Sequence, residues 1–378
     1  MQFYLMNKQN IIAIVDISNN DIKTVHAIDE EFISNMNKIV DDKFKWLMKR
    51  TGFVGRKNIR ELMNHIGAFD RENLIQISKG ISINDTLWLN EIDNQTSWKD
   101  VNPYTNSFSE AISNLALNCN YNGGNLNTPS VEYTIDGAYS KCCKRVNHKT
   151  VMVKASHEKF SSITGNESSS EVLCNQLCEY LDIPKSDYVR YNLTEKRTES
   201  GFIKAYTTCE LFTNQQIGFI PFGDSIYNKL DVREQVELFD KGGYGEKFRN
   251  MLILDCITYN TDRHAWNYGF LIDNNTFKVR GLAPIFDNNL SCLHNVSFSK
   301  NPEDIRYDIS IKESKFSCSF EELLALTLYN GFKERVIQAR KKYGEFKIDT
   351  KRTGSLEHYR CKFLEQLIRN RLNSITKF

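Results

Sequence analysis

Short apolar runs alternate with polar turns over the first 28 residues of the chain. The runs FYLM, IIAIVDI and IKTVHAI are separated by turns that contain Asn, Lys and Asp. Alternation of this kind is typical of strands in an antiparallel sheet. The pattern therefore predicts two or three antiparallel strands at the start of the fold.

The spacing of apolar residues then changes to three and four, which is typical of helices with one buried face. This spacing predicts helices over residues 32–48 and 58–66. Residues 94–127 are rich in Asn, Ser, Trp and Tyr and contain a Gly-Gly pair. We expect an irregular linking segment there.

Strand patterns return at residue 131, where a strand, a turn and a second strand precede a helix over 169–181 and further strands. Mostly helical periodicity follows, at residues 232–239, 248–259, 320–329 and 360–372. A sheet-rich half followed by a helix-rich half predicts a two-lobed α+β protein. We expect three parts: an α/β subdomain without an assigned role, a sheet-rich lobe and a helical lobe, at residues 1–115, 116–208 and 209–378.

Composition narrows the class of protein. The 378 residues, 40% of them hydrophobic, can bury at least one large core. The net charge of +2 gives no bulk attraction to nucleic acid or to an anionic membrane. No apolar run is long enough to cross a bilayer and no signal peptide is recognisable, so we expect a cytoplasmic protein. The ten cysteines form no C-x-x-C ladder, and we interpret most of them as small buried hydrophobic residues rather than zinc ligands.

A basic cluster interrupts this near-neutral chain, at Lys49, Arg50, Arg56, Lys57 and Arg60. Clustered cations could contact nucleic acid in a segment that resembles a helix-turn-helix. The alternative, which we favour, is an ordinary solvated face.

The clearest chemical signal is the segment T-D-R-H-A-W-N at residues 261–267, directly after an apolar helical run. It places Asp262 and Asn267 five residues apart in one loop. Kinases hold a catalytic carboxylate beside a metal-binding amide in this way. His264, between them, is expected to orient the loop rather than to act as the base.

A second carboxylate follows in L-A-P-I-F-D, which ends at Asp287. The residues between the two segments, 268–272 and 277–280, have the pattern of a β-hairpin. Such a hairpin could bring Asp287 back beside Asn267. One or two carboxylates together with substrate phosphates are the usual ligands of Mg²⁺, so both residues suit that metal.

Upstream, the apolar strand T-V-M-V-K ends at Lys154. A cation there could pair with nucleotide phosphates and be oriented by a helix carboxylate, for which Glu171 is the candidate. The preceding turn, residues 134–140, could present backbone amides and hydroxyls to phosphates through Gly137 and Ser140.

Each of these residues also has an ordinary structural interpretation. Asp262, Asn267 and Asp287 could be turn residues, and Lys154 could be a solvated cation. Ser168-x-x-Glu171 has the spacing of a capping box. The kinase interpretation depends on all of the parts occurring together and in order.

In that order, the parts resemble HipA-like serine/threonine kinases, most clearly over residues 130–295. The resemblance implies a kinase-like fold of the HipA type that binds ATP and Mg²⁺ between a sheet-rich N-lobe and a helical C-lobe. Asp262 would be the base, Asn267 and Asp287 the metal ligands, and Lys154 the phosphate-pairing cation. Gly137 and Ser140 would belong to the phosphate-covering loop, and the strand that contains Tyr206 would contact adenine.

The chain lacks a multi-glycine loop, an H-R-D segment and D-F-G, which excludes an ordinary eukaryotic-type protein kinase. The resemblance implies a protein substrate with a Ser or Thr acceptor, autophosphorylation and an antitoxin-like partner. Two alternatives stay open: a catalytically silent ATP-binding regulator, and a DNA-binding regulator of the toxin–antitoxin type.

Overall fold

The computed structural model describes residues 1–18, 21–50, 64–67, 71–119, 121, 123–135, 137–298 and 300–377. The chain divides into two compact units, each assembled from three segments. The first unit is Met1–Lys154, Glu210–Asn228 and Gly269–Gly281, and the second is Ala155–Cys209, Lys229–Tyr268 and Leu282–Phe378. The three-part division at residues 115 and 208 stays a prediction.

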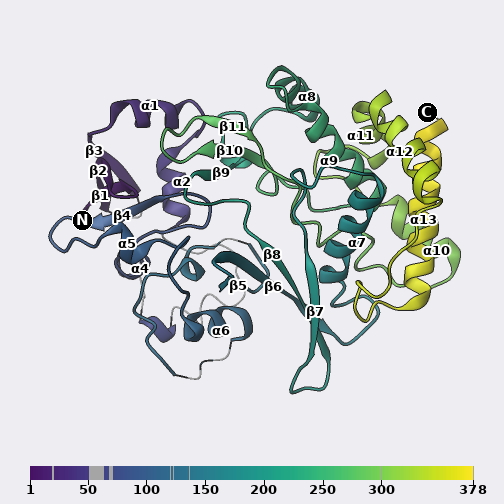
Figure 1. The fold of residues 1–378 in the computed structure, drawn as a ribbon, viewed down its shortest axis with the longest axis horizontal. Coiled ribbons are helices and arrows are strands. Elements are labelled where there is room, and N and C mark those ends of the chain that lie inside the picture. The colour runs from purple at the N-terminus through teal and green to yellow at the C-terminus, as the bar shows by residue number, and fades with distance from the viewer. Residues whose placement is uncertain are drawn as a thin grey trace. The chain divides into compact units, whose positions relative to one another are not determined.

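The first unit begins with the strands that the alternating pattern predicts (Figure 1). They are β1 (Gln2–Asn7), β2 (Asn10–Ser18) and β3 (Asp21–Ala27). Both consecutive pairs are antiparallel, which confirms the prediction. A strand that the sequence analysis did not predict, β4 (Leu87–Glu91), pairs with β1 and completes the sheet order β3-β2-β1-β4.

The helix expected over residues 32–48 is two helices, α1 (Glu30–Asn37) and α2 (Lys43–Lys49). The break has a physical cause, because Val40 forms a β-bridge with Ser225 and the amide of Asp41 donates to the carbonyl oxygen of Asp224. These bonds replace the ones that would continue a helix. Most of the second predicted helix, residues 58–63, lies outside the described residues.

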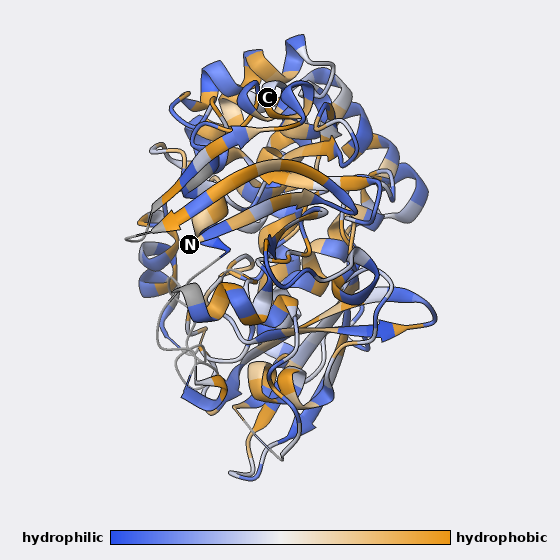
Figure 2. Cartoon of the chain, turned by 90° about the vertical axis from the view of Figure 1, so that its left-hand side faces the viewer, coloured by the Kyte–Doolittle hydropathy of each residue, from blue (hydrophilic) through white to orange (hydrophobic). Residues whose placement is uncertain are grey.

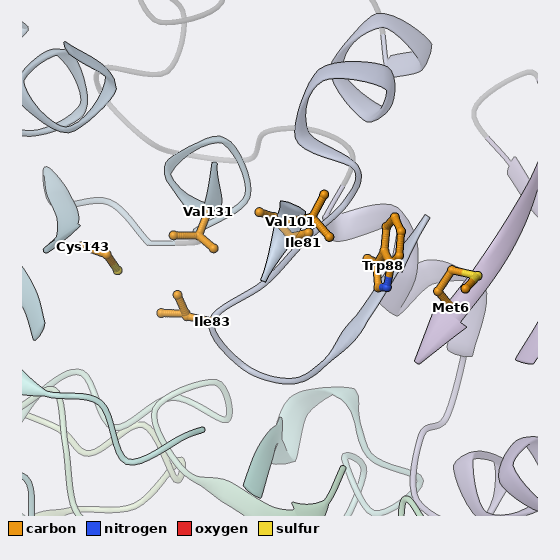
Figure 3. Packing of buried hydrophobic residues seen from close by; sticks show 7 residues of the cluster. All are labelled: Met6, Ile81, Ile83, Trp88, Val101, Val131 and Cys143. Carbon is orange, nitrogen blue, oxygen red and sulfur yellow. The ribbon is translucent and has the colours of Figure 1, made fainter. Parts of the chain in front are cut away.

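The segment expected to be irregular contains two helices, α5 (Trp98–Val101) and α6 (Glu110–Asn118). The expectation was wrong for α6, because Ser109 caps its first turn and Ile112 and Leu115 are buried on one face. That face joins a cluster formed by α6, α4 (Arg71–Ser78) and the short 3-10 helix η1 (Val131–Tyr133). A second cluster collects side chains from strands, helices and loops of the same unit (Figure 3): Met6, Ile81, Ile83, Trp88, Val101, Val131 and Cys143.

The predicted hairpin is present as β10 (Gly269–Asp273) and β11 (Val279–Leu282). It forms a three-stranded sheet with β9 (Ile217–Pro221), which precedes the 3-10 helix η2 (Phe222–Asp224). A further sheet has the order β5-β6-β8-β7. Its strands are β5 (Lys141–Val146), β6 (Lys149–Lys159), β7 (Asn192–Arg197) and β8 (Ile203–Glu210), and β6 runs from the first unit into the second.

The second unit is otherwise mostly helical. Its helices are α7 (Glu167–Tyr180), α8 (Val232–Lys241), α9 (Gly245–Thr258), α10 (Pro302–Ser310), α11 (Phe320–Thr327), α12 (Asn330–Tyr343) and α13 (His358–Lys377). The helix-rich C-terminal part is confirmed, and Figure 2 shows hydrophobic and hydrophilic stretches together on the helices near the C-terminus. Within the described residues, no helix has the length and apolar character needed to span a membrane.

Helix α9 is the centre of this unit. Nearly all of its residues from Phe248 to Thr258 are buried, and it packs against α8, α11 and α13. The rings of Phe239 on α8 and Phe248 on α9 lie 4.4 Å apart. Because α9 is fixed on several sides, the loop at its C-terminus starts from a rigid support.

Candidate active site

The loop that carries Asp262 begins where α9 ends. Tyr259 follows the helix in the left-handed conformation, with φ of 52°, and Asn260 then donates its amide to the carbonyl of Asp255 at 3.0 Å. The side-chain oxygen of Asn260 accepts the amide of Asp262 at 3.0 Å. This asparagine turn fixes the backbone of Asp262 one turn beyond the helix.

The structure brings Asp262 and Asn267 together within this loop. Nδ2 of Asn267 donates to the carbonyl oxygen of Asp262 at 2.9 Å. The Asn267 side chain is buried, whereas the Asp262 side chain is 27% exposed. The loop thus presents an accessible carboxylate beside a buried amide. Since the amide nitrogen is committed to the loop, Oδ1 is the Asn267 atom that could bind a metal.

His264 has the contacts of a loop-orienting side chain. Its Nδ1 accepts the amide of Trp266 at 3.3 Å, and its Nε2 lies 3.9 Å from Oδ2 of Asp262. With Nδ1 as an acceptor, neutral His264 carries its proton on Nε2, on the side of Asp262.

Asp287 follows a short extended segment that pairs with another loop of the same unit. Ile285 forms a parallel bridge with Tyr188, and its carbonyl accepts the amide of Val189 at 2.8 Å. Asp287 itself has φ of 56°, in the left-handed region that non-glycine residues seldom adopt. Its amide donates to the hydroxyl of Tyr191 at 3.2 Å. A backbone held in this conformation by its surroundings is typical of functional sites.

Glu171 supports the turn that contains Asp287. It is fully buried on α7, and its Oε2 accepts the amide of Asn288 at 2.8 Å. The capping-box interpretation of Ser168 and Glu171 was wrong, because α7 already begins at Glu167. Ser168 is therefore inside the helix, and its amide donates to the hydroxyl of Ser156 at 2.9 Å.

The sequence analysis gave no role to Arg263, yet this residue connects the two candidate segments. Its NH1 group donates to the carbonyl oxygen of Asn267 at 3.1 Å and to that of Phe286 at 2.5 Å. The predicted approach of Asp287 to Asn267 is thus present at the level of the backbone. Asp255, the ion-pair partner of Arg263, is the acidic residue in an otherwise apolar stretch of α9, and that isolation was the signal available in the sequence.

Burial shifts the pKa values of two side chains around this turn, Tyr191 and Arg263. Burial raises the pKa of the Tyr191 hydroxyl well above its usual value, and the charge of Glu171 adds to the rise, so the hydroxyl stays a donor and acceptor at any working pH. For Arg263, burial lowers the pKa, but attraction and hydrogen bonds from Asp255 outweigh it and raise the pKa overall. The guanidinium is therefore always charged.

Of the remaining residues predicted to bind the nucleotide, Lys154, Gly137 and Ser140 lie in the first unit and Tyr206 lies in the second. Lys154 lies on β6 opposite Lys141 of β5, with its Nζ 5.4 Å from the centre of the Tyr139 ring. Gly137 has φ of 105°, which favours glycine, and a Cβ there would meet Nζ of Lys141. Lys154 and the turn that contains Gly137, Tyr139 and Ser140 therefore lie together in the first unit.

Tyr206 lies on β8 in the second unit, opposite Thr194 of β7. Burial raises the pKa of its hydroxyl, with a further contribution from Glu158. Its expected place beside adenine stays a prediction.

The donor set of the Asp287 region suits magnesium. A carboxylate from Asp287 and an amide oxygen from Asn267 are hard oxygen ligands, and they leave room for phosphate oxygens and water in an octahedral shell. Residues that hold a metal mainly through sulfur or imidazole would favour zinc instead.

Comparisons with known proteins bear on the fold. No protein-family model matches the chain, and a search of curated proteins finds no match. Among solved structures, HipA of the Shewanella oneidensis MR-1 toxin–antitoxin system, solved with HipB and operator DNA, matches with a TM-score of 0.50 and 11% identity, over 100% of this chain and 99% of that one.

Two further structures match over part of the chain and with lower TM-scores. The Helicobacter pylori proinflammatory kinase CtkA matches with a TM-score of 0.47 and 16% identity, over 63% of this chain and 93% of its own. The Leishmania major MAP kinase LmaMPK10 matches with a TM-score of 0.23 and 12% identity, over 64% and 80%. The likeness to HipA extends over the full length of the chain, and it shows that the chain adopts the kinase-like fold of HipA.

Proposed function

We propose that this chain is a HipA-like serine/threonine kinase that uses ATP and Mg²⁺ to phosphorylate a protein hydroxyl. The observation that carries the proposal is the pairing of Asp262 with Asn267. An accessible carboxylate is tied to a buried amide whose oxygen can bind a metal, and one arginine joins this loop to the Asp287 turn.

In the proposed reaction, the hydroxyl oxygen of the acceptor attacks the γ-phosphorus of ATP. Asp262 accepts the hydroxyl proton, the bond between the γ-phosphorus and the bridging oxygen breaks, and ADP leaves. Asn267 and Asp287 would hold magnesium, which supplies positive charge to the phosphates when it is bound. Most of the rate enhancement comes from positioning, since phosphoryl transfer asks for little covalent help from the protein.

Lys154 would pair with the phosphates, and the turn with Gly137 and Ser140 would cover them. Two facts support this pair of roles: the lysine lies over the Tyr139 ring of that turn, and the turn contains a glycine in the left-handed region. Glu171 would hold the Asp287 turn through the amide of Asn288. Its expected part in orienting Lys154 stays a prediction.

Labelling with γ-labelled ATP and Mg²⁺ tests the proposal. We expect the wild-type chain to label itself or a lysate protein, and Asp262→Asn and Asp287→Asn to abolish the label. Asp308→Asn is the control, because this aspartate lies in an exposed ion pair with Lys300. A wild-type chain that binds ATP but labels nothing would favour a catalytically silent regulator. Labelling by both variants at the wild-type rate would refute the assigned roles.

The likeness to HipA also suggests a partner. That protein was solved with HipB and operator DNA, and we propose an antitoxin-like protein partner for this chain. Direct DNA binding by the basic cluster has less support, because Lys49 is paired with Asp224 and Arg50 with Asp85. Arg56, Lys57 and Arg60 lie outside the described residues.

A further inference from the structure

Arg263 is a buried arginine whose five N–H donors all have acceptors. The side chain is 1% exposed. Nε donates to Oδ2 of Asp255 at 2.9 Å, and NH2 donates to Oδ1 of Asp255 at 3.0 Å and to Oδ1 of Asn288 at 2.5 Å. NH1 supplies the two bonds to the carbonyl oxygens of Asn267 and Phe286. No N–H group of Arg263 therefore remains to bind a substrate or a phosphate.

These five bonds join three segments of the second unit. Asp255 lies on the rigid helix α9 and holds two donors in a bidentate pair. Asn267 belongs to the loop after α9, and Phe286 and Asn288 flank Asp287. The guanidinium therefore joins the loop and the turn to the buried helix α9.

A single nitrogen bonds the backbone at both candidate segments. NH1 bonds the carbonyl of Asn267 itself and the carbonyl of the residue before Asp287. Because a guanidinium is planar and rigid, the two carbonyl oxygens must lie where its two hydrogens point.

Asn288 is held from a second side, which leaves the turn little freedom. Its side-chain oxygen accepts from Arg263 and its amide donates to Glu171. The amide of Asp287 is meanwhile held by the Tyr191 hydroxyl. Together these bonds maintain the left-handed backbone of Asp287.

We propose that Arg263 is a positioning residue that sets the spacing of Asn267 and Asp287, so that the chain's affinity for magnesium depends on it. This inference rests on the proposed function. Lysine could keep the charge, but its three donors lie on one nitrogen and form no planar fork, so it cannot make the five bonds that Arg263 makes.

The test compares Arg263→Lys with Arg360→Lys. Arg360 is equally buried and also donates to carbonyl oxygens, those of Leu293, Val296 and Ser162, but it does not contact the candidate ligands. Both changes should lower stability. Only Arg263→Lys should weaken magnesium binding, by about 10- to 100-fold, as is usual when a residue that orients metal ligands is lost.

Magnesium binding is read without catalysis, from the shift in melting temperature as Mg²⁺ is titrated at a fixed concentration of a non-hydrolysable ATP analogue. Hydrogen exchange of peptides that cover residues 286–288 should rise in Arg263→Lys and stay unchanged in Arg360→Lys. In labelling assays, the Mg²⁺ concentration that gives the half-maximal rate should also rise in Arg263→Lys.

If Arg263→Lys does not fold, Asn288→Ala takes its place, since it removes one Arg263 acceptor and should move the magnesium titration in the same direction by less. A folded variant at position 263 or 288 with a wild-type magnesium titration would overturn the positioning role. That outcome differs from failure of the proposed function, in which the wild-type chain itself labels nothing.

Discussion

Nδ2 of the Asn267 side chain donates to the backbone carbonyl of Asp262 at 2.9 Å, so the metal-binding candidate and the candidate base share one hydrogen bond. Because of this bond, the Asn267 side chain has two separate properties: its oxygen can bind a metal, and its nitrogen holds the carbonyl of Asp262. An aspartate at position 267 could still bind a metal through oxygen, but it could not donate to the carbonyl of Asp262.

Asn267→Asp is therefore expected to keep magnesium binding and to lose phosphoryl transfer. Two oxygens would face each other where a donor now meets an acceptor, so the loop must rearrange. We expect kcat to fall by roughly 100-fold, the usual scale when a group aligned for the transition state is displaced. Steady-state labelling at saturating Mg²⁺ measures this fall.

Asn274→Asp is the matched control. Its Nδ2 also donates to a backbone carbonyl, that of Asn214, at 2.9 Å, and the side chain is equally buried. This change should cost stability and leave kcat unchanged. Equal effects of the two substitutions on kcat would show that the bond in the loop has no special part in the reaction.

Glu171→Ala should affect both stability and labelling. Removing the carboxylate leaves the buried amide of Asn288 without its acceptor, which costs about 1–3 kcal/mol of the free energy of unfolding. The turn that contains Asp287 would also lose one of its fixed points, so labelling should fall. Urea denaturation and the labelling rate measure the two effects.

Glu234→Ala provides the comparison, because Glu234 and Asp231 form a true capping box at the start of α8. Its loss should cost about 0.3–1.5 kcal/mol and leave labelling intact. If Glu171→Ala behaved in the same way, the contact with Asn288 would be structural only.

The wrong capping-box interpretation of Glu171 shows which features a sequence can predict and which it cannot. The S-x-x-E spacing is a valid local signal, but α7 begins two residues earlier than a capping box at Ser168 requires. Where a helix begins depends here on tertiary bonds, such as that of Ser168 to Ser156. Periodicity located α7, α8, α9 and the β10–β11 hairpin, because each of these reports burial of its own residues.

The hydrophobic pattern of the sequence does not predict which distant segments pair with each other. Strand β4 joins β1 across about 80 residues of chain, and the bridge of Val40 with Ser225 divides a predicted helix in two. The same limit applies to the site. Asp262 and Asn267 are five residues apart and form a recognisable motif, whereas the acceptors of Arg263 come from three segments that the sequence does not connect.

His294 is expected to make stability depend on pH. Burial lowers the pKa of its imidazole to about 4, Glu167 opposes this effect, and Lys312 and Arg360 add to it. The unfolded chain takes up this proton near pH 6.5 and the folded chain does not. The free energy of unfolding should therefore fall as the pH drops through this window, by about 2 kcal/mol between pH 7.5 and pH 5.

Urea denaturation at the two pH values measures this loss. His294→Asn should remove about that amount of the pH dependence, and His148→Asn, at an exposed position, should leave it unchanged. A pH dependence that survives in His294→Asn would assign the loss to other groups.

The buried ion pair of Arg50 and Asp85 gives the last prediction. Arg50 donates to both carboxylate oxygens of Asp85, through NH1 at 2.9 Å and through NH2, and its guanidinium lies 4.2 Å from the centre of the Trp46 ring. Asp85→Asn would leave this cation buried without an opposite charge. We expect a loss of about 3–5 kcal/mol in the free energy of unfolding.

Tryptophan fluorescence during urea denaturation measures this loss, since Trp46 lies beside the pair. Glu210→Gln is the control, because its pair with Lys149 is more than half exposed and should contribute at most about 1 kcal/mol. Equal losses in the two variants would mean that Arg50 reaches solvent when Asp85 is neutral. In that case the basic cluster could present Arg50 to an anionic partner, and the DNA-binding alternative would regain support.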